Sequence, residues 1–323
     1  MSRDARELAC NISRVAINLR VVGAFIKLGR PLFTVGGFLF YGLGAATAVA
    51  AGARFDGWRY VLGQVVVTAA QLMVHYANDY FDLEADRANR TPTRWSGGSR
   101  VLPDGVLPAR VALIAALALA VVALAVANVL ALRLPDLGLL LPLAAVMTGL
   151  AWFYSAPPLR FCARGLGEAT TALVVTLCVP ALGYYLQAGA FHPRLLAVCA
   201  LPVALQFAML LAIEFPDAAG DAAAGKRTLV VRIGGRAGAR LYAAVTIGAF
   251  GILPLLPFVG LPVIVATAPL VLAPIAIWQA TRVVRGGYAD SARFEGIAFW
   301  SVALLTSAGA LQLAATIVVM PGG

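Results

Sequence analysis

The stretch Asn78-Asp79-Tyr80-Phe81-Asp82-Leu83-Glu84-Ala85-Asp86 ends a long apolar run with a cluster of acids. Because Asn78, Asp82 and Asp86 are spaced four apart, one face of a helix carries all three side chains. A second apolar run ends in Asp217-Ala218-Ala219-Gly220-Asp221, with the same spacing between its acids. Carboxylates beside a bilayer are costly unless they are paired or bind a metal. The two clusters therefore predict a polar site at the ends of two helices.

The composition predicts that these acids belong to a polytopic membrane protein. Of the 323 residues, 61% are hydrophobic and 12% are charged, and the mean hydropathy is +0.87. That leaves too little polar surface for a soluble globule of this size. A spanning helix needs about 20 apolar residues. We expect an all-α fold, a single bundle of about nine transmembrane helices with a cytoplasm-facing cavity. The expected spans are residues 31–51, 59–80, 107–131, 137–154, 168–187, 194–214, 239–257, 261–282 and 296–319.

The distribution of positive charge predicts the orientation of the bundle. If the N-terminus is cytoplasmic, 21 of the 25 Lys and Arg residues lie on the cytoplasmic side, as the positive-inside rule requires. Both acidic clusters then face the cytoplasm, most simply at a bacterial inner membrane. This asymmetry and contact with lipid headgroups explain the net charge of +10, and no nucleic-acid-binding motif is present.

Two regions are expected along the chain. Residues 31–323 form the bundle, and residues 1–30 form an amphipathic segment in the membrane interface. Within residues 1–30, apolar residues recur at spacings of three and four, the pattern of a helix with one apolar face. They are Leu8, Ile12, Val15, Leu19, Val22 and Ile26.

Basic, glycine-containing loops follow both acidic clusters. Arg94 comes after the first cluster, and Lys226 comes after the second. Carboxylates bind Mg²⁺, which keeps coordination positions for phosphate oxygens, and Lys and Arg neutralise the remaining anionic oxygens. The pattern favours a metal-bound lipid diphosphate. A secondary transporter is an alternative, but carriers place their ionisable residues near the bilayer midplane, whereas these acids lie at its boundary.

Three motifs, taken in order, resemble the signatures of the UbiA superfamily of intramembrane prenyltransferases. They are Asn78-Asp79-x-x-Asp82-x-x-x-Asp86, Tyr154-Ser155-Ala156-Pro157-Pro158-Leu159-Arg160 and Asp217-x-x-x-Asp221. The resemblance spans nearly the whole chain. The stretch Gly225-Lys226-Arg227-Thr228-Leu229 is most similar to the 1,4-dihydroxy-2-naphthoate prenyltransferases of menaquinone synthesis. This chain has Glu214 where those enzymes commonly have asparagine, so hydroxybenzoate, homogentisate, chlorophyllide, and lipid or sugar phosphates stay open as acceptors.

The resemblance implies Mg²⁺-dependent transfer of a prenyl chain from a polyprenyl diphosphate to an aromatic acceptor. It also implies roles for eleven positions of this sequence. One Mg²⁺ is expected on Asn78, Asp82 and Asp86, and a second on Asp217 and Asp221. Diphosphate oxygens are expected to bind Arg94, Arg160, Lys226 and Asn78. The catalytic candidates are Asp79, which supports a metal or acts as base, Tyr154, whose ring faces an allylic cation, and Glu214, which contacts the acceptor or handles a proton.

Overall fold

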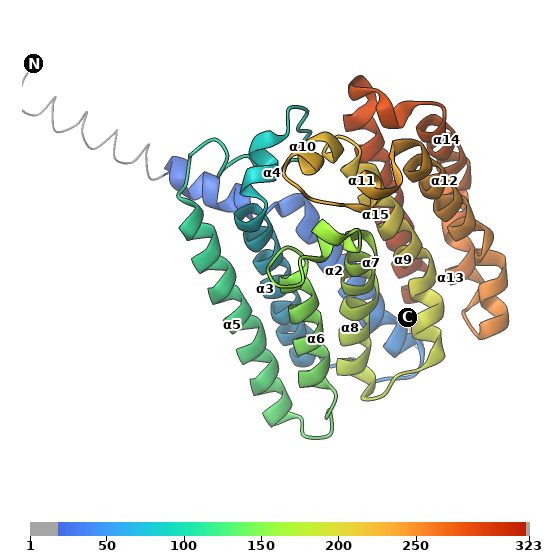
Figure 1. The fold of residues 1–323 in the computed structure, drawn as a ribbon. Coiled ribbons are helices and arrows are strands. Elements are labelled where there is room, and N and C mark those ends of the chain that lie inside the picture. Colours follow the sequence, from blue (N-terminus) through green and yellow to red (C-terminus); the bar gives the residue numbers. More distant parts are fainter. Residues whose placement is uncertain (1–18, 321–323) are drawn as a thin grey trace, which may run out of the picture.

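The computed structural model describes residues 19–320, and all the regular secondary structure in this part of the chain is helical, as the sequence predicts (Figure 1). Long helices run side by side, and several short helices lie at one end of the bundle. The α-helices are α2 (Pro31–Ala50), α3 (Gly57–Phe81), α4 (Leu83–Ala88), α5 (Ala109–Arg133), α6 (Leu140–Phe153), α7 (Gly167–Leu173), α8 (Val179–Ala188), α9 (Pro193–Glu214), α10 (Ala218–Ala223), α11 (Leu229–Ile233), α12 (Gly235–Gly251), α13 (Val263–Thr267), α14 (Ala273–Val284) and α15 (Phe294–Val318). Short segments of other helix types are η1 (Phe161–Arg164), η2 (Val174–Cys178), η3 (Leu253–Val259), η4 (Ala268–Leu272), η5 (Gly287–Ala289) and η6 (Ser291–Arg293).

Most of these helices are suited to a bilayer. Within residues 19–320, 7 helical segments are long and apolar enough to span a membrane, or up to 8 if the bent pair α12 and η3 is one span. Helix α6 has 14 residues, fewer than the roughly 20 that a bilayer requires. The seven segments, the bent pair and α6 correspond to the nine predicted spans. That all nine cross the membrane stays a prediction. The chain is an integral, multi-pass membrane protein.

Two prolines interrupt regular winding inside spans. Pro180 lies two residues after the end of the π-helical turn η2, in the span that joins α7 to α8. Proline has no N–H, and its ring clashes with the carbonyl four residues earlier, so the helix widens at this point. Pro254 lies at the start of η3, where the helix axis bends by 48° after α12.

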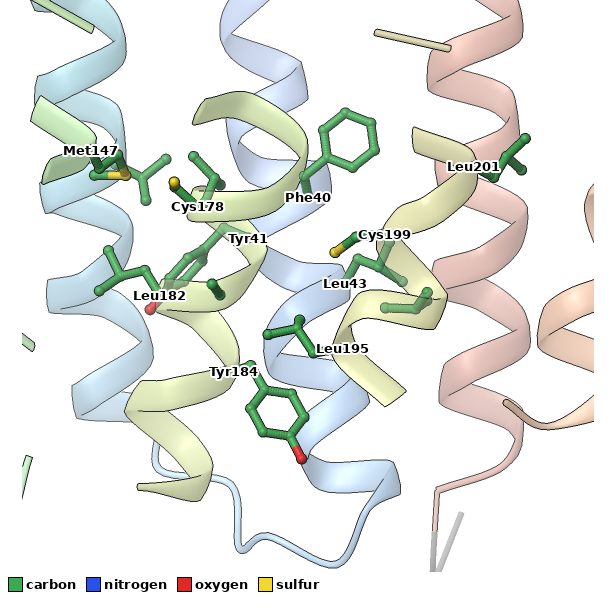
Figure 2. Close-up of a cluster of buried hydrophobic side chains, with 14 of the residues drawn as sticks. Phe40, Tyr41, Leu43, Met147, Cys178, Leu182, Tyr184, Leu195, Cys199 and Leu201 are labelled. Atoms are coloured by element: carbon green, nitrogen blue, oxygen red, sulfur yellow. The ribbon is translucent and has the colours of Figure 1, made fainter. Parts of the chain in front are cut away.

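The largest group of buried apolar side chains lies where α2, α8 and α9 meet, and includes Phe40, Leu182 and Cys199 (Figure 2). Helix α2 packs closely on α8 because glycines lie at the crossing. A Cβ atom on Gly44 would lie 1.9 Å from the carbonyl oxygen of Pro180. The core therefore depends on the absence of a side chain at this position.

The polar end of the bundle, at the top of Figure 1, carries α4 and α10 side by side. Helical residues 19–28 lie across the same end (dark blue in Figure 1). Leu19, Val22 and Ile26 are exposed there, as an apolar face in contact with lipid requires. The remaining predicted members of that face, Leu8, Ile12 and Val15, lie outside the described residues.

We expect Gly44→Ala to lower the free energy of unfolding by about 1–3 kcal/mol, because the added methyl group overpacks the α2–α8 contact. Gly149→Ala is the control, since Gly149 is also inside a helix but has no atom within 4 Å of an added Cβ. Thermal unfolding in detergent measures both. Equal melting temperatures for the two variants would contradict this description of the core.

Candidate functional site

Both acidic clusters lie where a long helix gives way to a short one. Helix α3 ends at Phe81, Asp82 lies at the junction, and α4 begins at Leu83. The Asp86 amide N–H donates to the Asp82 carbonyl oxygen at 2.9 Å, so the four-residue spacing is kept across the junction. In the same way α9 ends at Glu214, and the Asp221 amide donates to the Asp217 carbonyl at 2.8 Å. Each pair of acids is thus held at the end of a span by helical hydrogen bonding.

Lys226 joins the two clusters. Its ammonium lies 3.0 Å from Asp82 Oδ2 and 3.1 Å from Asp221 Oδ1, and its side chain is only 10% exposed. Although burial disfavours the charged form, the Asp82 and Asp221 carboxylates raise the pKa of Lys226 well above its usual value. A permanently charged ammonium is therefore fixed between acids that are 139 positions apart in the sequence.

Asp217 is held by the loop that follows the first cluster. Asn89 Nδ2 donates to Asp217 Oδ1 at 2.6 Å, and the Gly97 amide donates to Asp217 Oδ2 at 3.1 Å. Each carboxylate oxygen can accept a further bond, so both oxygens retain capacity for a cation. The glycine-containing loop of the first cluster thus positions an acid of the second.

Asp79 is fully buried and accepts hydrogen bonds from two segments. Arg30 Nη2 donates to Asp79 Oδ1 at 2.6 Å, and the Ser99 amide donates to Asp79 Oδ2 at 3.1 Å. The Ser99 hydroxyl also donates to Asp79 Oδ2. These contacts tie the segment before α2 and the glycine-containing loop to α3. The catalytic role expected for Asp79 stays a prediction, and its contacts suit a positioning role.

Gly98 lets the backbone pass directly over Asp86. Its φ of +73° lies in the left-handed region, which glycine adopts at no steric cost. A Cβ atom at this position would lie 2.1 Å from Asp86 Oδ2. The Arg100 guanidinium donates to the Asp86 carbonyl oxygen and closes the loop.

The oxygen atoms of this end of the bundle suit a hard divalent cation. Asn78 Oδ1, Asp82 Oδ1 and Asp86 Oδ2 are buried and accept no hydrogen bond. Burial raises the pKa of Asp86 to about 8 and that of Asp217 to about 6, and a cation beside them would favour the ionised forms. Within residues 19–320, no group of three or more His, Cys, Asp or Glu converges to hold an ion alone. Mg²⁺ commonly uses one or two carboxylates together with substrate phosphates, which fits this donor set.

An apolar cavity of about 190 Å³ lies next to the acids. Arg30, Asn78 and Tyr154 line it, together with His75, whose buried Nε2 has no hydrogen-bond partner. Burial raises the pKa of the Tyr154 hydroxyl above its usual value, so it stays protonated. Most of the remaining wall is apolar and comes from α2, η2, α9 and α15, including Phe33, Phe40, Val174, Val175, Met209, Leu210, Ile213, Val302 and Leu305.

Two predicted phosphate-binding residues make no contact with the acids in the described part of the chain. Arg94 is exposed and its guanidinium lies 5.9 Å from the centre of the Trp95 ring. Arg160 has a left-handed backbone at the start of η1, with φ 46°. Their roles stay predictions.

Sequence reasoning missed Arg30, Asn89 and Ser99, which bind the predicted acids directly. A signal exists for Arg30, because it is the last cation before the span that begins at Pro31. No local sequence pattern distinguishes Asn89 and Ser99 from ordinary loop residues. Glu214, a predicted residue, is buried at the end of α9 next to Glu168 of α7.

Comparison with known proteins places this geometry in a family. The model of the UbiA prenyltransferase family matches residues 38–314. A 1,4-dihydroxy-2-naphthoate octaprenyltransferase of Mycobacterium leprae (strain TN) is 30% identical over 275 residues, which are 80% of this chain and 86% of that protein. A digeranylgeranylglyceryl phosphate synthase of Pyrococcus abyssi is 32% identical over 164 residues, 51% of this chain and 53% of that protein.

The fold is also similar to that of a solved structure. A UbiA homolog from Archaeoglobus fulgidus bound to DMAPP and Mg²⁺ superposes with a TM-score of 0.59, and its sequence is 16% identical to this chain. The superposition covers 89% of this chain and 98% of that chain. The helical arrangement described above is therefore a known one.

We expect Gly98→Ala to abolish most of the activity of the site, because the added methyl group displaces Asp86. Gly105→Ala is the matched control: Gly105 lies in the same loop with φ +69° and has no atom within 4 Å of an added Cβ. Both variants carry the conformational cost of a positive φ, roughly 1–2 kcal/mol, and only the first carries the clash. Initial rates of Mg²⁺-dependent turnover measure the difference. Equal rates would show that the activity does not depend on the close approach of the Gly98 backbone to Asp86.

Proposed function

This chain belongs to the UbiA prenyltransferase family, and we propose that it transfers a prenyl chain from a polyprenyl diphosphate to 1,4-dihydroxy-2-naphthoate, as in menaquinone biosynthesis. The single observation that carries the proposal is the arrangement of charge over an apolar cavity. Lys226 and two pairs of acids lie at one end, and the cavity beside them has an apolar wall. A diphosphate suits the first part and an isoprenoid tail suits the second.

The charged end binds the diphosphate. Lys226 and Arg30 are buried cations that lie next to the acids, and each can donate to phosphate oxygens. Arg94 and Arg160 extend toward the diphosphate from neighbouring loops when it binds. Arg30 also lines the cavity, so it neutralises charge at the point where the tail meets the diphosphate.

Two Mg²⁺ ions complete this end in our proposal. Asn78, Asp82 and Asp86 would hold one ion, and Asp217 and Asp221 the other. Bound Mg²⁺ would stabilise the negative charge that develops on the departing diphosphate. The oxygens without partners on Asn78, Asp82 and Asp86 support the first assignment. The A. fulgidus homolog, whose structure contains DMAPP and Mg²⁺, supports the use of this ion.

Side chains of this protein exclude water from the reaction and stabilise the cation. The bond between the allylic carbon and the diphosphate oxygen breaks, a carbon–carbon bond forms at the aromatic ring, and the ring loses a proton. The apolar wall keeps water from the allylic cation. The Tyr154 ring faces the cation, and the cation–π attraction between them stabilises the cation by roughly 0.5–2 kcal/mol. Glu214, at the end of α9, contacts the acceptor, and Asp79 holds Arg30 in place.

The naphthoate acceptor is favoured over the others by two features. One is the similarity of the chain to the octaprenyltransferase of M. leprae over most of its length. The other is the Gly225-Lys226-Arg227-Thr228-Leu229 stretch. Similarity to the P. abyssi synthase covers only about half of each protein, so a glycerol phosphate lipid is the second candidate.

The site faces the cytoplasm in our proposal, most simply at a bacterial inner membrane. Positive charge lies mainly at the end of the bundle that carries α4 and α10, which is the side expected to stay inside. Residues 1–30 form the interfacial segment, and the exposed Leu19, Val22 and Ile26 give it an apolar face toward lipid.

The reaction is tested by incubating purified protein in lipid with a labelled prenyl diphosphate and a panel of aromatic acids and glycerol phosphate lipids. We expect prenylated naphthoquinol as the main product by mass spectrometry, formed with Mg²⁺ and not with a chelator. A prenylated lipid as the main product would replace the proposed acceptor. No Mg²⁺-dependent product from any acceptor would overturn the function.

Substituting one acid of each pair tests the metal assignment. We expect Asp82→Asn and Asp217→Asn each to reduce turnover by a factor of about 10² or more, because each removes a negative charge from a metal position. Glu84→Gln is the control, since Glu84 is exposed and lies two positions from both Asp82 and Asp86, off the helix face that they share. Near-normal turnover by Asp217→Asn would show that the second ion is placed elsewhere.

A further inference from the structure

Glu168 and Glu214 form a buried pair of carboxyl groups that the reaction described above does not fully use. Glu168 is the second residue of α7, and Glu214 is the last residue of α9, helices that pack against each other. The two side chains are near neighbours, and each affects the ionisation of the other. Glu168 is 1% exposed and Glu214 is 7% exposed.

No donor from the described part of the protein reaches three of their four oxygens. Glu168 Oε1, Glu168 Oε2 and Glu214 Oε2 are buried without a hydrogen-bond partner. The Lys226 ammonium, which acts electrostatically on Glu214, is already paired with Asp82 and Asp221. Leaving such buried groups without donors is unfavourable. A cost of this kind is typical of sites where the missing donors come from a ligand.

The pair lies beside the proposed reaction site. Thr170 and Thr171, which follow Glu168 on α7, line the cavity, as does Ile213 next to Glu214. The charge of Glu214 acts on both Tyr154 and Lys226. A ligand whose ring lies next to Tyr154 can therefore present polar groups toward the two carboxyl groups.

We propose that Glu168 and Glu214 together bind the hydroxyl groups of the aromatic acceptor and so determine which acceptors react. This inference rests on the proposed function. It adds how the acceptor is selected, which the proposed function leaves open. Hydroxyl groups supply the O–H donors that the buried oxygens lack. A hydroxyl that donates to a carboxyl oxygen also gives more electron density to its ring, which favours attack on the allylic cation. The pair selects phenols or aromatic diols against ethers and against acceptors whose only polar group is an anion.

The test compares Glu168→Gln and Glu214→Gln with the wild-type protein, and uses Glu84→Gln as a control for loss of an exposed acid. Each variant keeps the size of the side chain and replaces one acceptor oxygen by an NH₂ donor. We expect the KM for the aromatic acceptor to rise about 10-fold or more, the loss of one charge-assisted hydrogen bond. The KM for the prenyl diphosphate should not change. Because the new NH₂ group donates to the remaining carboxyl group, the melting temperature should rise.

A second measurement needs no variant. An unreactive hydroxyl-bearing analogue of the acceptor and its methyl ether are compared as competitive inhibitors of the wild-type protein. We expect the hydroxyl compound to bind about 10-fold or more tightly, and the preference to disappear in either Gln variant.

The outcomes separate this inference from the proposed function. If the wild-type protein prenylates aromatic acceptors while the variants keep both the acceptor KM and the preference for the hydroxyl analogue, the inference is wrong and the function stands. If acceptor and diphosphate KM values rise together and the melting temperature falls, the pair is only structural. Failure of the wild-type protein to prenylate any aromatic acceptor overturns both.

Discussion

The ammonium of Lys226 between Asp82 and Asp221 is the interaction on which the polar end of this membrane protein depends. Two spans end in buried acids, and such acids repel one another and resist removal from water unless a cation lies between them. Lys226 supplies that cation at 3.0 and 3.1 Å. The short helices α4 and α10 can therefore lie side by side, and the acids of each remain close enough to share a ligand.

The neighbouring loops keep this arrangement in place without covering it. Asn89 and Gly97 hold Asp217, and Arg30 and Ser99 hold Asp79. Each of these bonds crosses between segments that are distant in sequence. The contacts leave oxygens of Asn78, Asp82 and Asp86 without partners, and Asn78 also lines the apolar cavity. A diphosphate with an isoprenoid tail complements both parts at once, which explains why charge and apolar wall occur together.

Local patterns in the sequence were sufficient for the fold and for the acids. Apolar runs located the spans to within a few residues, because the length of a span is fixed by the bilayer. The four-residue spacing identified Asp82 with Asp86 and Asp217 with Asp221. Pairings over long distances could not be predicted: Arg30 with Asp79 and Glu168 with Glu214 depend on how helices pack. The bend of 48° at η3 and the short α6 likewise left the number of spans open.

In our proposal, the ends of α3 and α9 form one receptor for a metal-bound diphosphate. Crystals of the protein grown with Mn²⁺ and an unreactive prenyl diphosphate analogue test it most directly, because Mn²⁺ replaces Mg²⁺ and its anomalous scattering locates each ion. We expect ions that contact both the diphosphate and the two pairs of acids, with the diphosphate oxygens near Lys226. Ions that contact neither pair, or a diphosphate bound away from Lys226, would contradict the claim.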